Sequence, residues 1–381
     1  MIAEATATDM LTVSCIEDDD GLPALAEEWN ALAGDVPFRR WDWLEASWRH
    51  FRNAQRSLFT LAVRNDDGKL VGLAPLYRQQ TLCQGCVVRL LGSDEACSDY
   101  LGVLAAREHE DEVAKQVAYW LAGDGMGRWD LLELNGVDAA DTLVRRLTAC
   151  LEARGHTLHV RNGLNCWRLK LPDHWDDYLA TLSRNRRQKC RSILRKTFDN
   201  GSAVLHRAED NDSLQRGLEI LVDLHQRRRA SIGEGGCFSS EPFRNFIAEI
   251  ADRFLQQETL RLQWIEIDGL PVAADFSLCG GDCTYGYQCG INPDFDRLRP
   301  GTLMMVANLK SAIAQGYREF DFLRGDEDYK LHWGAEPRPS LEIRVVPPHA
   351  IAKTRHRLWL TGKTIKHWMK AGQLRMGISC S

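Results

Sequence analysis

Residues 58–76 read LFTLAVRNDDGKLVGLAPL, and residues 260–278 read LRLQWIEIDGLPVAADFSL. Each stretch has two apolar runs, rich in β-branched residues, on either side of an Asp-Gly pair. This pattern is a strong short-range signal for a β-hairpin. Asp67-Gly68 in the first stretch corresponds to Asp268-Gly269 in the second. The sequence therefore predicts the same hairpin in both halves of the chain.

A second pair of similar segments follows the two hairpins. Residues 127–134 read GRWDLLEL and residues 316–323 read GYREFDFL, and each segment is predicted to be a strand. Apolar residues at helical spacing precede each strand, over Glu110–Ala122 and Thr302–Gln315. Two matches in the same order indicate an internal duplication. Two α+β units of about 160 residues each fit the size of typical domains.

The composition is that of an ordinary globular protein, since 44% of the 381 residues are hydrophobic and 27% are charged. The N-terminus has no basic segment followed by an apolar core, and no window of about 20 residues is apolar throughout. The 12 cysteines are scattered, and the one close pair, Cys83-Gln-Gly-Cys86, lacks the second pair that a zinc ribbon needs. We therefore expect a cytoplasmic protein with reduced thiols and no bound metal.

Two regions are strongly basic. Ser183 is predicted to cap a helix that ends near Asn200-Gly201, and residues 184–196 carry seven Lys and Arg side chains and no acid. We expect this helix to bind an anion, because no acid relieves the repulsion. The alternative is a solvated helix whose long side chains cover apolar surface. Residues 343–381 carry eight Lys and Arg and no Asp or Glu, which indicates either contact with an anionic membrane surface or polyanion, or another solvated helix.

Pro300-Gly301 is predicted to open a helix after two strands between residues 272 and 289. Free amides and the positive end of the helix dipole make such a start an anion site, with Thr302 in its first turn. Arg297 and Arg299 lie immediately before the start and are expected to reach a diphosphate. The alternative is an ordinary turn into a helix.

Residues 320–333 read FDFLRGDEDYKLHW and combine a strand, a turn and a short helix. Tyr329 and Trp333 are four residues apart and share a helix face. Lys330, next to Tyr329, is a candidate to stabilise an oxyanion or to protonate a leaving group. The alternative is that the aromatic side chains belong to the core and Lys330 forms a surface salt bridge.

At this point the motifs together resemble a known family over Trp29–Trp333. They resemble the bacterial GNAT-superfamily acetyltransferases of the CelD type, named for an association with cellulose biosynthesis. The resemblance to the Fem-type peptidoglycan aminoacyltransferases, which have two tandem GNAT-like units, is more distant. The motifs that carry the resemblance are Trp41-x-Trp43, Gly72-Leu-Ala-Pro-Leu76, Ser98-Asp-Tyr-Leu101, Leu182-Ser-Arg-Asn-Arg-Arg187, Pro300-Gly301-Thr-Leu303, and Phe320 to Gly325 continuing through Tyr329 to Trp333.

The resemblance implies an α+β fold of two tandem GNAT-like domains with mixed central sheets, followed by a basic helical segment. The expected boundaries are 1–165 for a structural or acceptor-binding domain, 166–345 for a donor-binding and catalytic domain, and 346–381 for the tail. The implied donor is acetyl-CoA or another acyl-CoA. The implied acceptor is an amine or hydroxyl on a small molecule, glycan or peptide of exopolysaccharide or cell-envelope metabolism, and not DNA.

The resemblance also implies roles for particular residues. In the Fem-type enzymes an arginine that matches Arg187 helps to hold a phosphate-bearing acceptor, and here Arg191 lies one turn further on. A lysine that matches Lys330 is implicated there in stabilising the transition state. We expect the substrate to contact also Asp99, Tyr100 and Trp333, and Tyr329 to accompany the catalytic lysine.

Direct acyl transfer needs a base for the acceptor and an acid for the departing thiolate. By their positions, Asp275 or Asp321 is expected to be the base, and Tyr285 or Tyr287 the acid. Two other functions stay open at this point. One is aminoacyl transfer to a cell-wall precursor, and the other is a non-catalytic subunit of an exopolysaccharide assembly.

Overall fold

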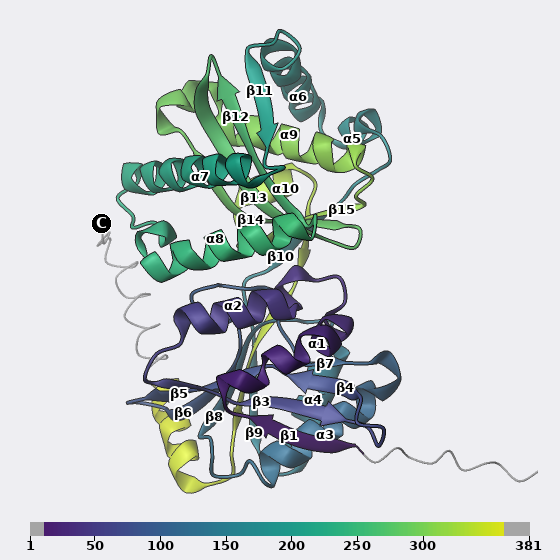
Figure 1. The fold of residues 1–381 in the computed structure, drawn as a ribbon, viewed down its shortest axis with the longest axis vertical. Helices are drawn as coiled ribbons and strands as arrows, with labels where there is room; N and C mark the ends of the chain where they lie inside the picture. The colour runs from purple at the N-terminus through teal and green to yellow at the C-terminus, as the bar shows by residue number, and fades with distance from the viewer. Residues whose placement is uncertain (1–10, 362–381) are drawn as a thin grey trace, which may run out of the picture.

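The computed structural model describes residues 11–361, which form two halves stacked along the long axis of the molecule (Figure 1). The lower half in this view holds the N-terminal strands in purple and blue, and the upper half holds the teal and green elements. The predicted α+β fold is confirmed, and each half is built on a mixed sheet of six or seven strands.

The upper half contains a seven-stranded sheet in the order β11-β12-β13-β14-β15-β10-β16. All neighbours in it are antiparallel except β14 and β15, which are parallel. Its strands are β10 (Cys166–Lys170), β11 (Ala203–Arg207), β12 (Leu260–Ile267), β13 (Leu270–Gly280), β14 (Cys283–Ile291), β15 (Glu319–Arg324) and β16 (Glu336–Arg338).

Helices cover both faces of this sheet. In Figure 1, α7 and α8 lie in front of the strands, whereas α9, with α5 and α6 beside it, lies behind them. Both α8 and α9 bury an apolar face in the core. The buried residues include Phe246 and Phe254 of α8 and Leu309 and Ile313 of α9. The helices are α5 (Trp175–Thr181), α6 (Arg184–Thr197), α7 (Asn211–Ser231), α8 (Glu241–Gln256), α9 (Pro300–Ala314) and α10 (Asp328–His332).

The lower half contains a four-stranded sheet, β1-β3-β4-β7, and a six-stranded sheet, β2-β5-β6-β8-β17-β9. The helices of this half are α1 (Ala26–Ala33), α2 (Trp41–Phe51), α3 (Glu110–Ala122) and α4 (Thr142–Ala153). The strands are β1 (Thr12–Ile16), β2 (Arg56–Leu58), β3 (Thr60–Arg64), β4 (Leu70–Ala74), β5 (Leu76–Thr81), β6 (Gly85–Leu90), β7 (Leu104–Ala105), β8 (Leu131–Asp138), β9 (Thr157–Asn162) and β17 (Ser340–Val346).

The internal duplication is visible in the strand pairing. The two predicted hairpins are present, as β3-β4 and β12-β13. In each half a strand, a helix and a parallel strand then follow, as β6, α3 and β8 and again as β14, α9 and β15. The copies differ at Pro75, where the lower half divides one long strand into β4 and β5, because proline has no N–H to continue a ladder.

Strand β17 joins the sheet of the opposite half from the strand that precedes it. Only Pro339 separates β16, in the upper sheet, from Ser340–Val346, which pairs with β8 and β9 of the lower sheet. The boundary expected at residue 345 stays a prediction, but these pairings place residues 340–346 in the lower half. From residue 350 to 361 the chain forms a helix; residues 362–381 of the expected basic tail lie outside the described range.

The hydrophobic core runs through the contact between the halves. Trp43 of α2 lies 4.9 Å from Phe246 and stacks at 6.4 Å on Phe254, both on α8. Aromatic pairs of this kind bury large areas and prefer edge-to-face or offset stacking. The two halves therefore share one apolar core.

Candidate functional site

Strands β14 and β15 part in the middle of the upper sheet. Their last register pair is Tyr285–Asp321, although β14 continues to Ile291 and β15 to Arg324. Paired strands satisfy their backbone groups in a ladder, so the facing edges beyond this pair need other partners. On β15 the amide and carbonyl groups of Leu323 and Arg324 already have partners within the protein, so an extended ligand that lies in the gap would pair with the edge of β14, as an added strand does.

A β-bulge lies next to the point where the strands part. Phe276 on β13 faces Gln288 and Ser277 faces Gly286, so Tyr287 is the extra residue of β14. Bulges redirect backbone groups and are over-represented next to active sites. The bulge therefore leaves the backbone of Tyr287 outside the ladder with β13, two residues beyond the last pair of β14 with β15.

Helix α9 begins at the same end of the sheet, directly after β14 and a short turn. Its start is as predicted: Pro300 is the first helical residue, and the first turn carries no acid. Arg299 precedes it in a left-handed conformation (φ 53°) and makes no side-chain cap. Arg297, Arg299 and Gly301 are exposed and Thr302 is half-buried, so a positive helix end and two guanidinium groups face solvent together. Their contact with a CoA diphosphate stays a prediction.

Lys330 is buried and fully hydrogen-bonded. Its Nζ donates to the carbonyl oxygens of Leu323, Arg324 and Gly325 at 3.0–3.1 Å and lies 2.9 Å from Glu327 Oε2. An ammonium group has three protons, and all three are used by these carbonyls. The expected role at an oxyanion stays a prediction. In this arrangement Lys330 holds the turn between β15 and α10, and it forms the salt bridge of the alternative with the exposed Glu327, although its own side chain is only 2% exposed.

A buried polar cluster joins the two halves beside β15. Asp321 is fully buried and accepts hydrogen bonds from Tyr100 Oη at 2.5 Å, Arg168 Nε at 2.8 Å and the Leu323 amide at 2.8 Å. Burial raises the pKa of Asp321, and the Arg168 guanidinium opposes that shift. Asp99 pairs with Arg324 Nε at 2.7 Å in the same cluster. These contacts link the loop at residues 98–101 to the catalytic half predicted from the sequence.

The backbone is strained on both sides of the Asp321 carboxylate. Tyr100 and Leu323, which both donate to it, have φ values of 61° and 56°. Bulky residues rarely adopt the left-handed conformation, and such strain persists only where the surroundings fix it. Asp321, Asp99 and Tyr100 are thus positioned tightly but buried, and their expected roles as base and substrate ligands stay predictions.

The tyrosines predicted to protonate the thiolate lie on the β14 side of the gap. Tyr285 is buried and packs edge-on against Phe38 at 5.8 Å. Tyr287 Oη donates to the carbonyl of Ala96 in the lower half at 2.8 Å. Tyr329, on α10, is 47% exposed and packs on Phe322. Of these three hydroxyl groups, only that of Tyr329 belongs to an exposed side chain.

Asp275 lies on β13, one strand away from the gap. It is opposite Cys289 of β14 in the register, and Ser277 Oγ donates to its carboxylate at 2.5 Å. Burial raises the pKa of Asp275 to about 6, while the bond from Ser277 opposes the shift. A carboxyl group with such a pKa can exchange a proton near neutral pH. Its role as a base stays a prediction.

The three side chains expected to hold an acceptor, Arg187 and Arg191 of α6 and Trp333 after α10, have different surroundings in the structure. Arg187 NH2 donates to the carbonyls of Ala180 and Leu182 at 3.2 and 3.1 Å, so it closes the end of α5. Arg191 is exposed. Trp333 is buried in the core, where its carbonyl accepts from Tyr178 Oη at 2.9 Å. Trp333 therefore belongs to the hydrophobic core, as in the alternative given for residues 320–333. The expected binding roles of Arg187, Arg191 and Trp333 stay predictions.

Two residues of the buried cluster, Arg168 and Arg324, were not among the candidates from sequence. Arg168 alternates with apolar residues on β10, and only its pairing with β15 brings it to Asp321. Within residues 11–361 no group of three or more His, Cys, Asp or Glu side chains is placed to hold a metal ion. No helix in the same range combines the length and apolar character needed to cross a bilayer.

Known proteins are similar to this chain in part of its sequence and in its fold. Residues 184–331 match the family model described as an acetyltransferase (GNAT) domain. Among solved structures, the chain is similar to FemX, with a TM-score of 0.61 and 13% identity over 90% of this chain and 99% of that chain. A search of curated proteins finds no match.

Two further solved structures are similar to the chain at low identity. The C-terminal domain of a putative lysylphosphatidylglycerol synthetase from Agrobacterium fabrum has a TM-score of 0.52 at 11% identity, over 91% of this chain and 97% of that chain. The structure of L-PGS from Bacillus licheniformis has a TM-score of 0.50 at 13% identity over the same shares. At these identities the likeness shows the fold alone. The strands that part, the bulge and the exposed helix start all lie within residues 184–331, the segment that matches the GNAT acetyltransferase model, and the chain as a whole is similar in fold to FemX.

Proposed function

We propose that this protein transfers an acyl group, an acetyl group in the simplest case, from a CoA thioester to an amine or hydroxyl acceptor. The observation that carries the proposal is the parting of β14 and β15 after Tyr285–Asp321, directly before the exposed start of α9. A ligand with a narrow, amide-containing chain can bind between β14 and β15 as an added strand does, while a diphosphate group of the same ligand binds the N-terminus of α9. Acyl-CoA has both parts, and the GNAT match of this region implies the same co-substrate.

The chemistry needs a donor for the thioester oxygen, a base for the acceptor and an acid for the thiolate. The proposed oxyanion donor is a backbone N–H group at the Tyr287 bulge, because this residue lies outside the ladder with β13 and two residues beyond the last pair of β14 with β15. We assign the acid to Tyr329, since of the three candidate tyrosines it alone has an exposed side chain, and burial of its hydroxyl group raises its pKa, which keeps the proton on the oxygen near neutral pH. Asp275 is the proposed base, because burial brings its pKa to about 6.

Titration with acetyl-CoA tests this proposal. A ligand at 100 times its Kd stabilises a protein by roughly 2.7 kcal/mol, which raises the melting temperature by about 3 °C for a chain of 381 residues that unfolds as one unit. We expect a saturable shift with acetyl-CoA and its loss in an Arg297→Ala, Arg299→Ala double variant. Lys310→Ala, at the far end of the same helix, is the matched control and should keep the shift. A wild-type protein that no CoA compound stabilises would contradict the proposal.

Further details of the function remain our proposals. They are a cytoplasmic location, a role in exopolysaccharide or cell-envelope metabolism, and the alternatives of aminoacyl transfer or of a non-catalytic assembly subunit. Stabilisation by charged tRNA instead of acetyl-CoA would favour aminoacyl transfer.

Contact with an anionic membrane is also a proposal, and residues 350–361 favour it. This helix packs Ala352 and His356 inward and leaves Ile351 and Leu358 64% and 68% exposed. Apolar residues flanked by Lys353 and Arg357 are typical of helices that lie in a bilayer surface. We expect co-sedimentation with vesicles that contain anionic lipid, and a clear loss of it in an Ile351→Asp, Leu358→Asp variant. Equal recovery of both proteins with these vesicles would contradict the contact.

A further inference from the structure

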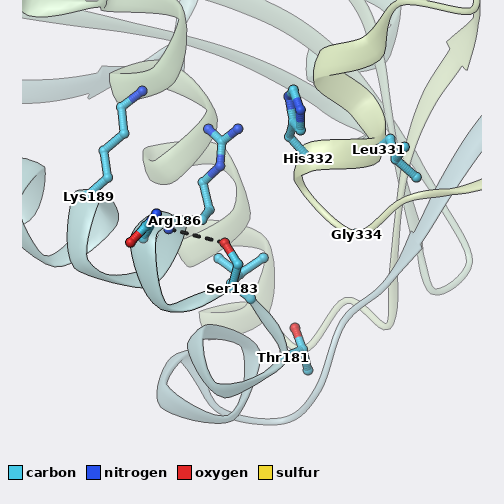
Figure 2. Close-up of a pocket in the computed structure, with 9 residues that line it drawn as sticks. Thr181, Ser183, Arg186, Lys189, Leu331, His332 and Gly334 are labelled. Carbon is cyan, nitrogen blue, oxygen red and sulfur yellow. Dashed lines mark hydrogen bonds between the residues drawn. The ribbon is translucent and has the colours of Figure 1, made fainter.

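A cavity of about 500 Å³ opens between α6 and the short helix α10 (Figure 2). Arg186 and Lys189 extend into it from α6, and His332 faces them from α10. In Figure 2 the polar ends of these three side chains point to the same side of the opening. The other lining residues are Thr181, Leu182, Ser183, Asn185, Leu331 and Gly334.

The two cations of this cavity have no carboxylate partner within residues 11–361. The ion pairs of the described chain engage arginines in both halves, including Arg168, Arg227 and Arg318, but not Arg186 or Lys189. Arg186 instead lies over the ring of Trp333, with its guanidinium carbon 5.0 Å from the ring centroid. That contact holds the side chain against an apolar wall and leaves its N–H groups available. Both side chains are half-buried, so their charges are only partly hydrated.

A third cation, Arg299, lies near enough to Lys189 for their charges to interact. Burial lowers the pKa of Lys189, and the charges of Arg299 and Arg186 lower it further. Arg299 immediately precedes the start of α9, where the donor diphosphate is placed in the proposed function. Helices α6 and α9 are in contact, so the cations of the cavity, Arg186 and Lys189, and Arg299 at the start of α9 act on one another through their charges.

Such an arrangement costs stability unless an anion is bound. Like charges on neighbouring helix positions repel, and partial burial strengthens the repulsion because the local dielectric constant is lower than in water. Within residues 184–196 no acid relieves it, as the sequence already shows. A clustered, shielded excess of one charge concentrates ligands of the opposite charge. A phosphate group with two negative charges satisfies several N–H donors at once.

We propose that this cavity binds a phosphate monoester, with Arg186 and Lys189 as its ligands, and that the monoester is the 3′-phosphate at the nucleotide end of the CoA donor. This assignment rests on the proposed function, which puts the diphosphate of the same molecule at the start of α9. A phosphorylated acceptor would offer the same chemistry to the same cations. Binding experiments with CoA and with a form of CoA that lacks the 3′-phosphate distinguish these two sources of the phosphate group.

Calorimetric titration with CoA and with dephospho-CoA, which lacks only the 3′-phosphate, tests the assignment. We expect the wild-type protein to bind CoA at least tenfold more tightly than dephospho-CoA. In an Arg186→Gln, Lys189→Gln variant, the affinity for CoA should fall at least tenfold, whereas that for dephospho-CoA should change less than threefold. The matched control is Arg195→Gln, Lys196→Gln, which removes two exposed cations from the last turn of the same helix and should bind both ligands as the wild type does.

The possible failures are distinguishable. If CoA binds but the Arg186→Gln, Lys189→Gln variant binds it as tightly as the wild type, the cavity assignment is overturned and the proposed function stands. If no CoA compound binds, the proposed function fails, and titration with inorganic pyrophosphate decides on the cavity. Binding of pyrophosphate that this variant loses and the control keeps would support a phosphate site for an acceptor; absence of that loss would overturn the site. Melting temperatures of the variants equal to or above that of the wild type show that they are folded.

Discussion

Replacement of Lys330 by alanine is expected to lower the free energy of unfolding by about 3–5 kcal/mol, the usual cost of removing one partner from a buried charged cluster. The physical reason is that three carbonyl oxygens, of Leu323, Arg324 and Gly325, lose their shared donor inside the protein. Glu327 loses its cation as well. Urea denaturation followed by circular dichroism measures the change, and Lys310→Ala, which removes an exposed lysine of α9, should stay within about 0.5 kcal/mol of the wild type.

The Lys330→Ala variant also separates two roles of this lysine. If Lys330 acts only by holding the turn, Lys330→Met, which keeps the stem without the charge, should lose stability and turnover together. If it stabilises the reacting group, Lys330→Arg should recover the stability partly but not the kcat. A Lys330→Ala protein as stable as the wild type would show that the three carbonyls are satisfied without it, and would contradict the structural role.

Removal of Arg168 is expected to cost about 3–5 kcal/mol, because it leaves the fully buried carboxylate of Asp321 without its cation. Chemical denaturation of Arg168→Ala measures this loss. Arg161→Ala is the matched control: it breaks the ion pair with Glu342, whose members are 41% and 30% exposed, and exposed pairs contribute about 0–1 kcal/mol.

A double-mutant cycle tests the reason for the Arg168 effect. Asp321→Asn removes the buried charge and keeps a group that can accept from Tyr100, so the double variant Arg168→Ala, Asp321→Asn should be more stable than Arg168→Ala alone. Residues in direct contact commonly show coupling energies of about 0.5–3 kcal/mol. Additive losses would mean that Arg168 acts through its packing over the rings of Tyr100 and Tyr285 and not through the carboxylate.

Local sequence signals predicted much of the fold. The Asp-Gly pairs gave both hairpins, and the apolar spacing gave the helix at Glu110–Ala122 with the bounds that the structure has. Ser183 caps α6 as predicted, by accepting from the amide of Arg186. These features depend on interactions between residues a few positions apart, so a single sequence is enough to reveal them.

The arrangement of the site depends on contacts that sequence spacing does not report. The pairing of β10 with β15 brings Arg168 to Asp321 across 153 positions of the chain. The location of Lys330 inside its own turn depends on Leu323 adopting a left-handed conformation, which a leucine seldom does. Arg187 matched a ligand position by motif, yet it donates to carbonyls at the end of α5. Arg168 was not among the residues singled out from the sequence, and for Lys330 and Arg187 the sequence did not predict the carbonyl groups that they contact.

The return of β17 to the lower sheet has a consequence for how the chain is made. The lower half is synthesised first, but its sheet lacks the strand between β8 and β9 until residues 340–346 have emerged from the ribosome. Until then two strand edges are open, and open edges pair readily with other chains. The whole upper half is made in that interval. The seven-residue strand β17 then completes the lower sheet and covers the open edges of β8 and β9.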